Sequence, residues 1–331
     1  MTNARTRVAV VGTGAWWGRQ HAIAFSIRTD ATLCAVVGRT PERAAQRAGE
    51  FDVPGYTDIE EMLDRERPDL VSVCLPNEGH FEPTRQIIRA GFPLLVEKPL
   101  VFELDQADAL IAEAAGRELF FAINFNHRYA RPVRLAEAAI RAGALGRLTF
   151  AWWRFGGEPG TSRHPHANLI ETQCHGLDLL EHLCGPVESV MGQMSDATGR
   201  GYSTLTVALR FAAGAVGSLV GTYDSSYSYP GAHLLEVNGL DGRILVEDTV
   251  RRYTYTPAGD EMSQVWQAGY FNDRDRDFHA TFDRYLDDLL PAFVEGRPPP
   301  VPATAGRRAL QLAHAVIESH ACGTRVPTPL R

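Results

Sequence analysis

The chain has 331 residues, of which 44% are hydrophobic and 22% charged, and its formal net charge is −7. The composition is ordinary for a globular protein with a large core, and the length predicts two domains. The chain has no block of like charges that would indicate nucleic-acid binding and no apolar run near the ~20 residues of a membrane span. The N-terminus lacks the apolar segment of a secretion signal and the five cysteines are scattered, so we expect a cytoplasmic protein with reduced thiols.

The first third of the chain alternates short apolar runs with helical patterns. The apolar runs, which we predict as parallel strands buried on both faces, are residues 7–11, 32–38, 70–76, 93–99 and 119–125. The helical patterns between them cover residues 18–28, 41–51, 58–65, 80–90 and 103–115. This alternation predicts an α/β domain with a doubly wound Rossmann sheet over residues 1–125. Such a sheet binds its ligand beyond the carboxyl ends of the strands.

The pattern changes over residues 126–331, where strand candidates follow one another with short polar turns. The candidates are residues 148–155, 187–195, 203–211, 215–223, 233–238, 242–247 and 251–256. Helical patterns at 168–183 and 277–296 interrupt this series, and a final helix follows the Pro-rich bend at 297–304. We therefore predict an α+β domain with a large, open, mostly antiparallel sheet, whose last helix can pack back on the first domain.

A glycine-rich turn joins the first predicted strand to the first predicted helix. It reads VVGTGAWWGRQHA, so Gly12 and Gly14 stand as in the dinucleotide fingerprint Gly-x-Gly-x-x-Gly, but the third glycine comes one residue late, at Gly18. The first glycine suits the tight turn, the second lets the backbone approach phosphate, and the helix N-terminus attracts the anion. We expect this turn to bind the pyrophosphate of a dinucleotide, with Gly18 starting the helix. The residues between the last two glycines, Ala15, Trp16 and Trp17, complete the predicted loop.

The second predicted strand ends in VVGRT, without the acidic residue that holds the ribose hydroxyls of NAD. Arg39 and Thr40 stand there instead, and a guanidinium suits a 2′-phosphate. The sequence therefore favours NADP, while stacking of Arg39 on the adenine would allow NAD as well.

The segments VVGTGAWWGRQHA, VSVCLPNEGH, LLVEKPL, FNHRYARP and CHGLDLL follow one another as in the Gfo/Idh/MocA oxidoreductases, which the chain resembles over almost its whole length. The resemblance implies NAD(P)-dependent oxidation or reduction at a hydroxyl or keto carbon of a sugar, cyclitol or derivative. It also implies that the second domain holds the substrate and forms a homodimer or homotetramer. In the family's motifs, the lysine of Glu-Lys-Pro lies at the nicotinamide of the bound cofactor and binds the reacting oxygen. A histidine four residues after an acid transfers the proton. The matching residues are Glu97, Lys98, Glu171 and His175.

The chemistry of these residues agrees with those roles. Lys98 follows a buried strand, where its ammonium can stabilise a developing alkoxide. An imidazole such as that of His175 can accept or return a proton near neutral pH, and Glu171, one helical turn earlier, can orient the ring. Two departures from the family pattern put the substrate's identity in doubt: the family's Asp is Glu171 here, and its Gly is Gln173. A lysine bound in a surface ion pair and a surface Glu–His pair are the alternative interpretations.

Several other polar residues are expected at the edges of the site. Pro76, Asn77 and His80 follow a predicted strand and are candidates for the cofactor site, although His80 can instead simply begin a helix. Arg128 and Tyr129 follow the last parallel strand and are candidate substrate contacts. The histidines of RHPHAN, residues 163–168, lack companion ligands at metal spacing, so we predict no metal site.

Two other functions start from the same fold. A non-catalytic dinucleotide-binding regulator would keep the glycine turn and lose the lysine and histidine, which this chain retains. An elimination or glycoside cleavage that recycles its cofactor begins with the same hydride step and would show product without net cofactor consumption.

Overall fold

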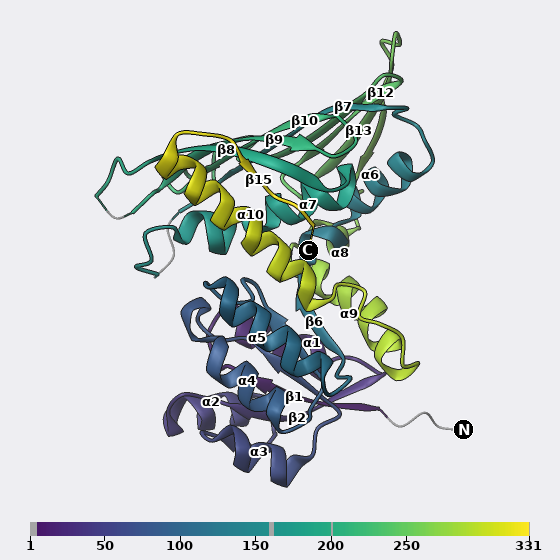
Figure 1. Ribbon diagram of the computed structural model, residues 1–331. Helices are drawn as coiled ribbons and strands as arrows, with labels where there is room; N and C mark the ends of the chain where they lie inside the picture. Colours follow the sequence, from purple (N-terminus) through teal and green to yellow (C-terminus); the bar gives the residue numbers. More distant parts are fainter. Residues whose placement is uncertain (1–4, 159–161, 200, 331) are drawn as a thin grey trace. The chain divides into compact units, whose positions relative to one another are not determined.

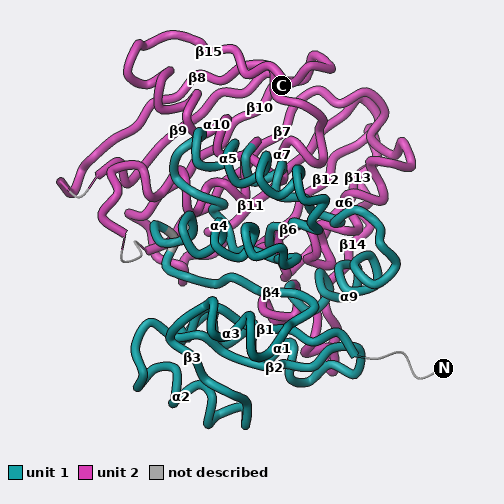
Figure 2. The backbone as a smooth tube through the Cα atoms, turned by 60° about the horizontal axis from the view of Figure 1, so that its bottom comes forward, with its two compact units in different colours: residues 1–124, 282–307 teal, residues 125–281, 308–331 magenta. Residues whose placement is uncertain are grey.

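The computed structural model describes residues 5–158, 162–199 and 201–330, apart from the side chain of Asn77. It divides into two compact units, which are described separately (Figures 1 and 2). Unit 1 comprises Met1–Asn124 and Phe282–Arg307, and unit 2 comprises Phe125–Thr281 and Arg308–Arg331. Two helices, α9 (Ala280–Val294) and α10 (Ala303–Cys322), contain residues of both units.

Unit 1 is built on a six-stranded parallel sheet in the order β3-β2-β1-β4-β5-β6. The order reverses between β1 and β4, which is where a doubly wound sheet binds its ligand. All residues of β4, β5 and β6 are buried, as predicted for strands covered on both faces. The strands are β1 (Thr6–Val11), β2 (Ala31–Val37), β3 (Gly55–Tyr56), β4 (Leu70–Val73), β5 (Leu94–Glu97) and β6 (Phe121–Asn124). The two-residue β3 was not predicted, because so short a strand has no periodicity.

The helices of unit 1 lie where the sequence predicts them. They are α1 (Trp17–Ser26), α2 (Pro41–Phe51), α3 (Ile59–Glu66), α4 (Phe81–Arg89) and α5 (Leu104–Ala115), with a short 3₁₀ turn at Asn77–Gly79. Thr40 and Asp58 cap α2 and α3, since their side-chain oxygens accept backbone N–H groups of the first turn. The C-terminal part of unit 1 adjoins β6, because Ile123 donates its N–H to the Val301 carbonyl at 3.0 Å.

Unit 2 contains a nine-stranded sheet in the order β14-β13-β12-β11-β7-β10-β9-β8-β15. Every pairing is antiparallel except that of β7 with β10. The strands are β7 (Leu148–Gly156), β8 (Val187–Ser195), β9 (Thr204–Phe211), β10 (Val216–Thr222), β11 (His233–Gly239), β12 (Gly242–Glu247), β13 (Arg252–Pro257), β14 (Gln264–Gln267) and β15 (Val326–Pro327). The predicted fold class, a Rossmann sheet followed by a mostly antiparallel α+β unit, is confirmed.

Helices cover one face of this sheet, and α7 packs directly on β7 (Figure 1). Burial alternates along β8 and β9, so that the residues between the buried ones face away from the core. The helices of unit 2 are α6 (Arg131–Arg141), α7 (Cys174–Cys184) and α8 (Asp273–Arg276), with a 3₁₀ turn at Asn126–Tyr129 and a π-helical turn at Asn168–Thr172. In the part of the chain that the structure describes, no helix is long and apolar enough to serve as a membrane span.

Candidate active site

The turn between β1 and α1 requires glycine at two positions and leaves a third open. Gly12 has a φ of +134°, and a Cβ there would lie 1.9 Å from the Cys74 carbonyl oxygen. A Cβ on Gly18 would lie 2.7 Å from the Gly12 carbonyl oxygen, so Gly18 lets the helix approach the strand. A Cβ on Gly14 would meet nothing within 4 Å. The backbone at Gly14 is therefore open to a ligand, and the turn fits the pyrophosphate of a dinucleotide beside a helix N-terminus.

The extra residue of this turn is absorbed in the first turn of the helix. The Arg19 N–H donates to the Gly14 carbonyl at 3.0 Å, five residues back rather than four. A wide turn of this kind is how a helix accommodates one inserted residue. The helix begins at Trp17, so the prediction that Gly18 starts it was wrong by one residue. Trp16 is 64% exposed, whereas the ring of Trp17 meets those of His21 and Phe282 edge-on.

A buried arginine of α2 forms hydrogen bonds to the glycine-rich loop. Arg47 is 6% exposed, and its guanidinium donates to the carbonyl oxygens of Thr13 at 3.2 Å and Gly14 at 3.4 Å. Its other terminal nitrogen bonds to Glu50, which also accepts from Arg19 at 2.6 Å. These hydrogen bonds tie the Thr13 and Gly14 carbonyl groups of the loop to α2.

Glu97 and Lys98 stand at the carboxyl end of β5, as predicted. The Glu97 side chain is buried and bonds to His21 at 2.8 Å and to Asn124 at 2.5 Å, and it accepts the backbone N–H of Lys98 at 3.2 Å. The second ring nitrogen of His21 bonds to Ser72 at 2.7 Å. Burial is the largest influence and raises the pKa of the Glu97 carboxyl, but the hydrogen bonds from His21 and Asn124 and the nearby charge of Lys98 together outweigh it and hold this pKa below its ordinary value. Glu97 is thus an anion fixed next to Lys98, whose side chain is half-buried.

The end of β2 packs closely against the start of α2. A Cβ on Gly38 would lie 2.8 Å from the Ala44 nitrogen, so this position needs glycine. Arg39 is exposed, and Thr40 caps α2. An anion beside Arg39 would therefore also lie near a helix N-terminus.

His80 lies in the interior of unit 1 instead of at an open edge. Its ring is fully buried, with Nδ1 2.8 Å from the Pro99 carbonyl oxygen and Nε2 3.0 Å from that of Leu75. Burial lowers the pKa of His80, and a neutral ring can donate to only one of the two carbonyls. His80 thus ties the Leu75 loop to the Lys98–Pro99 segment. Pro76 is exposed in that loop, and the side chain of Asn77 lies outside the described residues.

In unit 2, Glu171 and His175 lie on one helical segment that changes type between them. Glu171 belongs to the π-helical turn, and His175 to the first turn of α7. The N–H of Gln173 donates to the Asn168 carbonyl five residues back, at 2.9 Å. The α-helical rule that residues four apart share a face does not apply across this wide turn, so joint action of the two side chains stays a prediction. Both residues are buried, at 7% and 6% exposure.

Aromatic rings surround His175. Its imidazole stacks on that of His127, with centroids 4.0 Å apart and planes 15° apart, and it meets the Phe125 ring edge-on at 6.0 Å. His127 in turn packs against Phe155 and Phe278. This packing fixes the plane of the His175 ring.

The unusual Gln173 has an internal role. Its amide accepts from the Trp153 indole at 3.2 Å and donates to the Phe155 carbonyl at 3.3 Å and the Asn168 side chain at 3.0 Å. A Cβ on Gly221 would lie 2.4 Å from Gln173, so that glycine makes room for the larger residue. Gln173 therefore anchors the segment to β7, and the departure from the family pattern is structural.

The two candidate substrate contacts that follow Phe125 have partners within unit 2. Arg128 forms a two-point ion pair with Asp178, at 2.8 and 2.5 Å. Tyr129 is 5% exposed, and its ring lies 5.4 Å from the Arg134 guanidinium. Substrate binding by Arg128 and Tyr129 stays a prediction.

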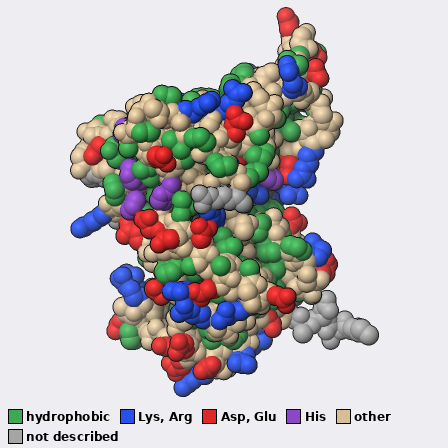
Figure 3. Space-filling model, viewed as in Figure 1, with side chains coloured by type: hydrophobic (Ala, Val, Ile, Leu, Met, Phe, Trp, Pro, Cys, Tyr) green, Lys and Arg blue, Asp and Glu red, His purple; other side chains and the backbone are tan. Residues whose placement is uncertain are grey.

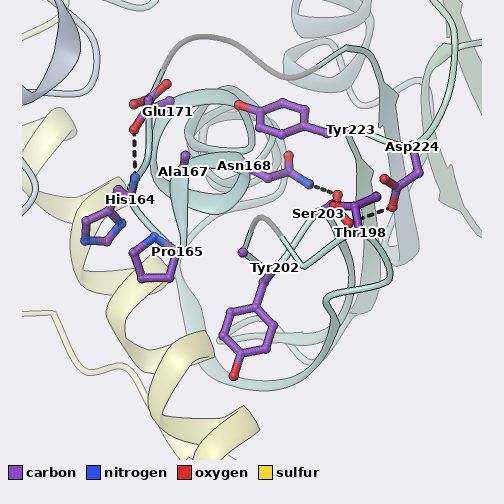
Figure 4. Close-up of a pocket in the computed structure, with 12 residues that line it drawn as sticks. His164, Pro165, Ala167, Asn168, Glu171, Thr198, Tyr202, Ser203, Tyr223 and Asp224 are labelled. Carbon is purple, nitrogen blue, oxygen red and sulfur yellow. Dashed lines mark hydrogen bonds between the residues drawn. The ribbon is translucent and has the colours of Figure 1, made fainter.

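A pocket of about 200 Å³ lies beside Glu171 within unit 2 (Figure 4). Its lining residues with polar side chains are Ser162, His164, Asn168, Glu171, Thr198, Tyr202, Ser203, Tyr223 and Asp224. Asn168 donates to the Ser203 carbonyl at 2.7 Å, and Ser203 donates its hydroxyl to Asp224 at 2.7 Å. Burial raises the pKa of Tyr223, which keeps the phenol neutral.

Histidines gather near this pocket, and Figure 3 shows histidine side chains grouped on one face of unit 2. The ring of His166 stacks on Tyr202 at 5.0 Å and lies 5.9 Å from that of His164. Burial and the neighbouring His164, His314 and His320 lower the pKa of His166. Among the described residues, no three His, Cys, Asp or Glu side chains are arranged to hold a metal ion.

Sequence reasoning assigned no role to four residues that support these groups: His21, Arg47, Asn124 and His127. His21 and His127 stand inside the quoted motifs, so their positions could have been noticed. No local pattern distinguishes Arg47 from other helical arginines.

Two family profiles match the chain. The NAD-binding Rossmann domain of the Gfo/Idh/MocA oxidoreductase family matches residues 6–125, and its C-terminal α/β domain matches residues 160–328. Myo-inositol 2-dehydrogenase of Thermotoga maritima is 28% identical over 95% of this chain and 96% of its own. D-glucoside 3-dehydrogenase of Escherichia coli is 30% identical over 56% of each chain, so this chain spans about half of that relative.

Solved structures of the same fold cover the whole chain. Levoglucosan dehydrogenase in complex with NADH and levoglucosan superposes with a TM-score of 0.89, at 20% identity, over 99% of this chain and 100% of its own. Three observations agree: the two profile matches, a glycine turn that fits a dinucleotide, and the Glu-Lys-Pro segment at the end of β5. The chain belongs to the Gfo/Idh/MocA family and is an NAD(P)-binding oxidoreductase.

Proposed function

We propose that the protein is an NAD(P)-dependent dehydrogenase or ketoreductase that acts on a hydroxyl or keto carbon of a sugar, cyclitol or derivative. The observation that carries the proposal is Lys98, which follows β5 at the ligand-binding edge of the sheet and adjoins the fixed carboxylate of Glu97. Relatives named as inositol and glucoside dehydrogenases support the substrate class.

Three side chains of this protein carry the proposed chemistry. Lys98 holds the reacting oxygen and stabilises its developing negative charge. His175 accepts the hydroxyl proton in the oxidative direction and returns it in the other, with its ring plane fixed by His127. Glu171 orients the imidazole ring of His175 or adjusts its basicity. The bound dinucleotide supplies the hydride acceptor or donor.

The glycine turn and its flanking residues form the proposed cofactor site. Gly12, Gly14, Ala15, Trp16, Trp17 and Gly18 would hold the pyrophosphate. Pro76 and Asn77 would lie along the remainder of the dinucleotide, with Glu97 and Lys98 beside the nicotinamide, and buried His80 would position the Pro76 loop. We propose NADP as the preferred cofactor, because a 2′-phosphate at the end of β2 would meet two exposed arginines, Arg39 and Arg43, and the start of α2 at Thr40.

The cofactor proposal is tested by titrating the wild-type protein and the Arg39→Ala variant with NADPH and with NADH and comparing the dissociation constants. Loss of a charge-assisted contact costs about 1.5–3 kcal/mol, so NADPH binding should weaken roughly tenfold or more while NADH binding changes little. Equal weakening of both cofactors would argue for NAD.

The activity is tested by following the absorbance of the reduced nicotinamide with a panel of sugars and cyclitols. Lys98→Met and His175→Asn should each lower kcat about 10²–10⁴-fold, and His175→Asn should leave cofactor affinity, measured by fluorescence, nearly unchanged. Glu171→Gln should be milder. His182→Asn is the matched control, because His182 lies on the same helix and bonds to Glu137 instead. Cofactor binding without turnover on any substrate would favour a regulator, and near-native kcat in His175→Asn would show that this histidine is structural.

A further inference from the structure

The charged side chains that line the pocket beside Glu171 are acidic. Carboxylates of Glu171 and Asp224 line it, and no lysine or arginine does so among the described residues. In the view of Figure 4 the two acids lie at opposite ends of the labelled group, with the Tyr223 ring between them. Carboxylates accept hydrogen bonds from hydroxyl groups and repel anions.

Asp224 is held so that one oxygen faces outward. Its Oδ2 accepts from the Ser203 hydroxyl at 2.7 Å and from the Thr204 hydroxyl at 2.6 Å, and its backbone N–H donates to Thr222 at 2.9 Å. Its Oδ1 has no hydrogen bond within the described part of the chain, and the residue is exposed. The carboxylate is therefore oriented by the protein and available to a ligand.

The pocket also offers apolar surface and limited space. The ring of Tyr202, itself stacked on His166, and the ring of Tyr223 provide flat faces for C–H groups. The volume of about 200 Å³ lies below the ~300–1,000 Å³ that encloses a drug-sized ligand, so a single small ring fits. His175, the proposed proton acceptor, follows Glu171 by four residues on the same helical segment.

We propose that this pocket binds an uncharged, polyhydroxylated second unit of the substrate, so that the protein prefers neutral glycosides to free monosaccharides and rejects anionic ones. This rests on the proposed function for the reacting ring. Asp224 is the specificity-determining residue: it accepts hydroxyl hydrogen bonds from the second unit and repels carboxylate or phosphate groups there.

The test compares kcat and KM for a neutral disaccharide, its parent monosaccharide and the matching disaccharide that carries a uronic acid. The wild-type protein should prefer the neutral disaccharide. Asp224→Asn should raise KM for it about tenfold or more, change KM for the monosaccharide less than twofold, and narrow the discrimination against the uronate. The exposed hairpin variant Asp260→Asn should match the wild type.

Tyr202→Leu is a second variant. It removes one of the aromatic faces of the pocket, so it should raise KM for the neutral disaccharide and leave KM for the monosaccharide unchanged. Three outcomes would overturn the pocket assignment: equal effects of Asp224→Asn on KM for all three sugars, no effect on any of them, or a wild-type preference for the uronate. Each of these outcomes would leave the proposed dehydrogenase function standing. If no sugar is turned over, the proposed function fails. Calorimetric binding of the neutral disaccharide then decides the pocket: binding that Asp224→Asn weakens supports it, and absent or unaltered binding overturns it.

Discussion

Two helices that carry candidate functional residues near their N-termini, α1 in unit 1 and α7 in unit 2, each have a wide backbone turn at that end. Each has a backbone hydrogen bond that spans five residues, from Arg19 to Gly14 and from Gln173 to Asn168. The turn before α1 could be predicted from the sequence as a one-residue insertion, because the fingerprint fixes the spacing of its glycines. The turn before α7 could not be predicted, because no particular residue type is required around it. A wide turn is therefore predictable only where sterically constrained residues frame it.

The two regions also differ in how their polar groups are satisfied. Around Glu97 the polar side chains are buried and bonded to one another, whereas the pocket beside Glu171 keeps a carboxylate oxygen of Asp224 open. Substitutions in the first region should chiefly reduce stability or cofactor binding. Substitutions in the second should change which substrate is accepted.

The largest expected effect is that of His21→Leu. It leaves the buried Glu97 carboxylate without its hydrogen-bond partner at 2.8 Å, and an uncompensated buried charge costs about 3–5 kcal/mol. Urea unfolding monitored by circular dichroism should show the loss. Adding Glu97→Gln to His21→Leu should recover part of it, since the uncompensated charge is removed. Strictly additive losses would mean that the two side chains do not act as a pair.

Gly14→Val should weaken dinucleotide binding by about 3 kcal/mol, or roughly 100-fold in Kd, because the side chain would occupy the open approach to the backbone. The fold should survive, since that space is empty of protein. Fluorescence titration with reduced cofactor measures the change. Gly49→Ala, at another glycine with open space around its Cβ, is the control. Undiminished binding by folded Gly14→Val would show that the phosphate approaches elsewhere.

In unit 2, His233 should make stability depend on pH. Burial lowers the pKa of His233 to about 4, so the unfolded chain binds the proton more readily. The stability contributed by the neutral ring is complete above pH ~6.5 and is lost as pH falls toward 4, by about 2 kcal/mol at pH 5. Urea midpoints at pH 7.5 and pH 5 should therefore differ less in His233→Gln than in the wild type. An equal difference in both proteins would refute this assignment.

The smallest effect is expected for Arg47→Met. It removes the bonds to the Thr13 and Gly14 carbonyls, so the glycine loop should lose order and cofactor affinity should fall by about 1 kcal/mol, roughly fivefold. Arg65→Met is the comparison, because Arg65 is exposed and forms its ion pair with Glu61 on its own helix. The same titration as for Gly14→Val measures both, and indistinguishable affinities would show that the loop needs no support from α2.

Parts of this molecule are determined locally and could be predicted. Apolar runs with intervening helical periodicity placed β1, β2, β4, β5 and β6, since strands covered on both faces have a composition that a linear sequence displays. The glycine turn and the position of Lys98 after β5 followed from the same pattern. The two-residue β3 and the parallel pairing of β7 with β10 left no such trace, because strand order depends on long-range contacts.

The supporting residues were decided by the tertiary structure alone. His21 lies 76 positions from Glu97, and Arg47 lies 34 positions from Thr13, so neither hydrogen bond has a local signature. Gln173 was recognised as a departure, but its role depended on Gly221 lying opposite it on β10. The sequence by itself determined the residue types that carry the chemistry and the strands after which they stand. Burial and the partners of each charge came from the packed fold, because those depend on chain segments that meet only when the protein is folded.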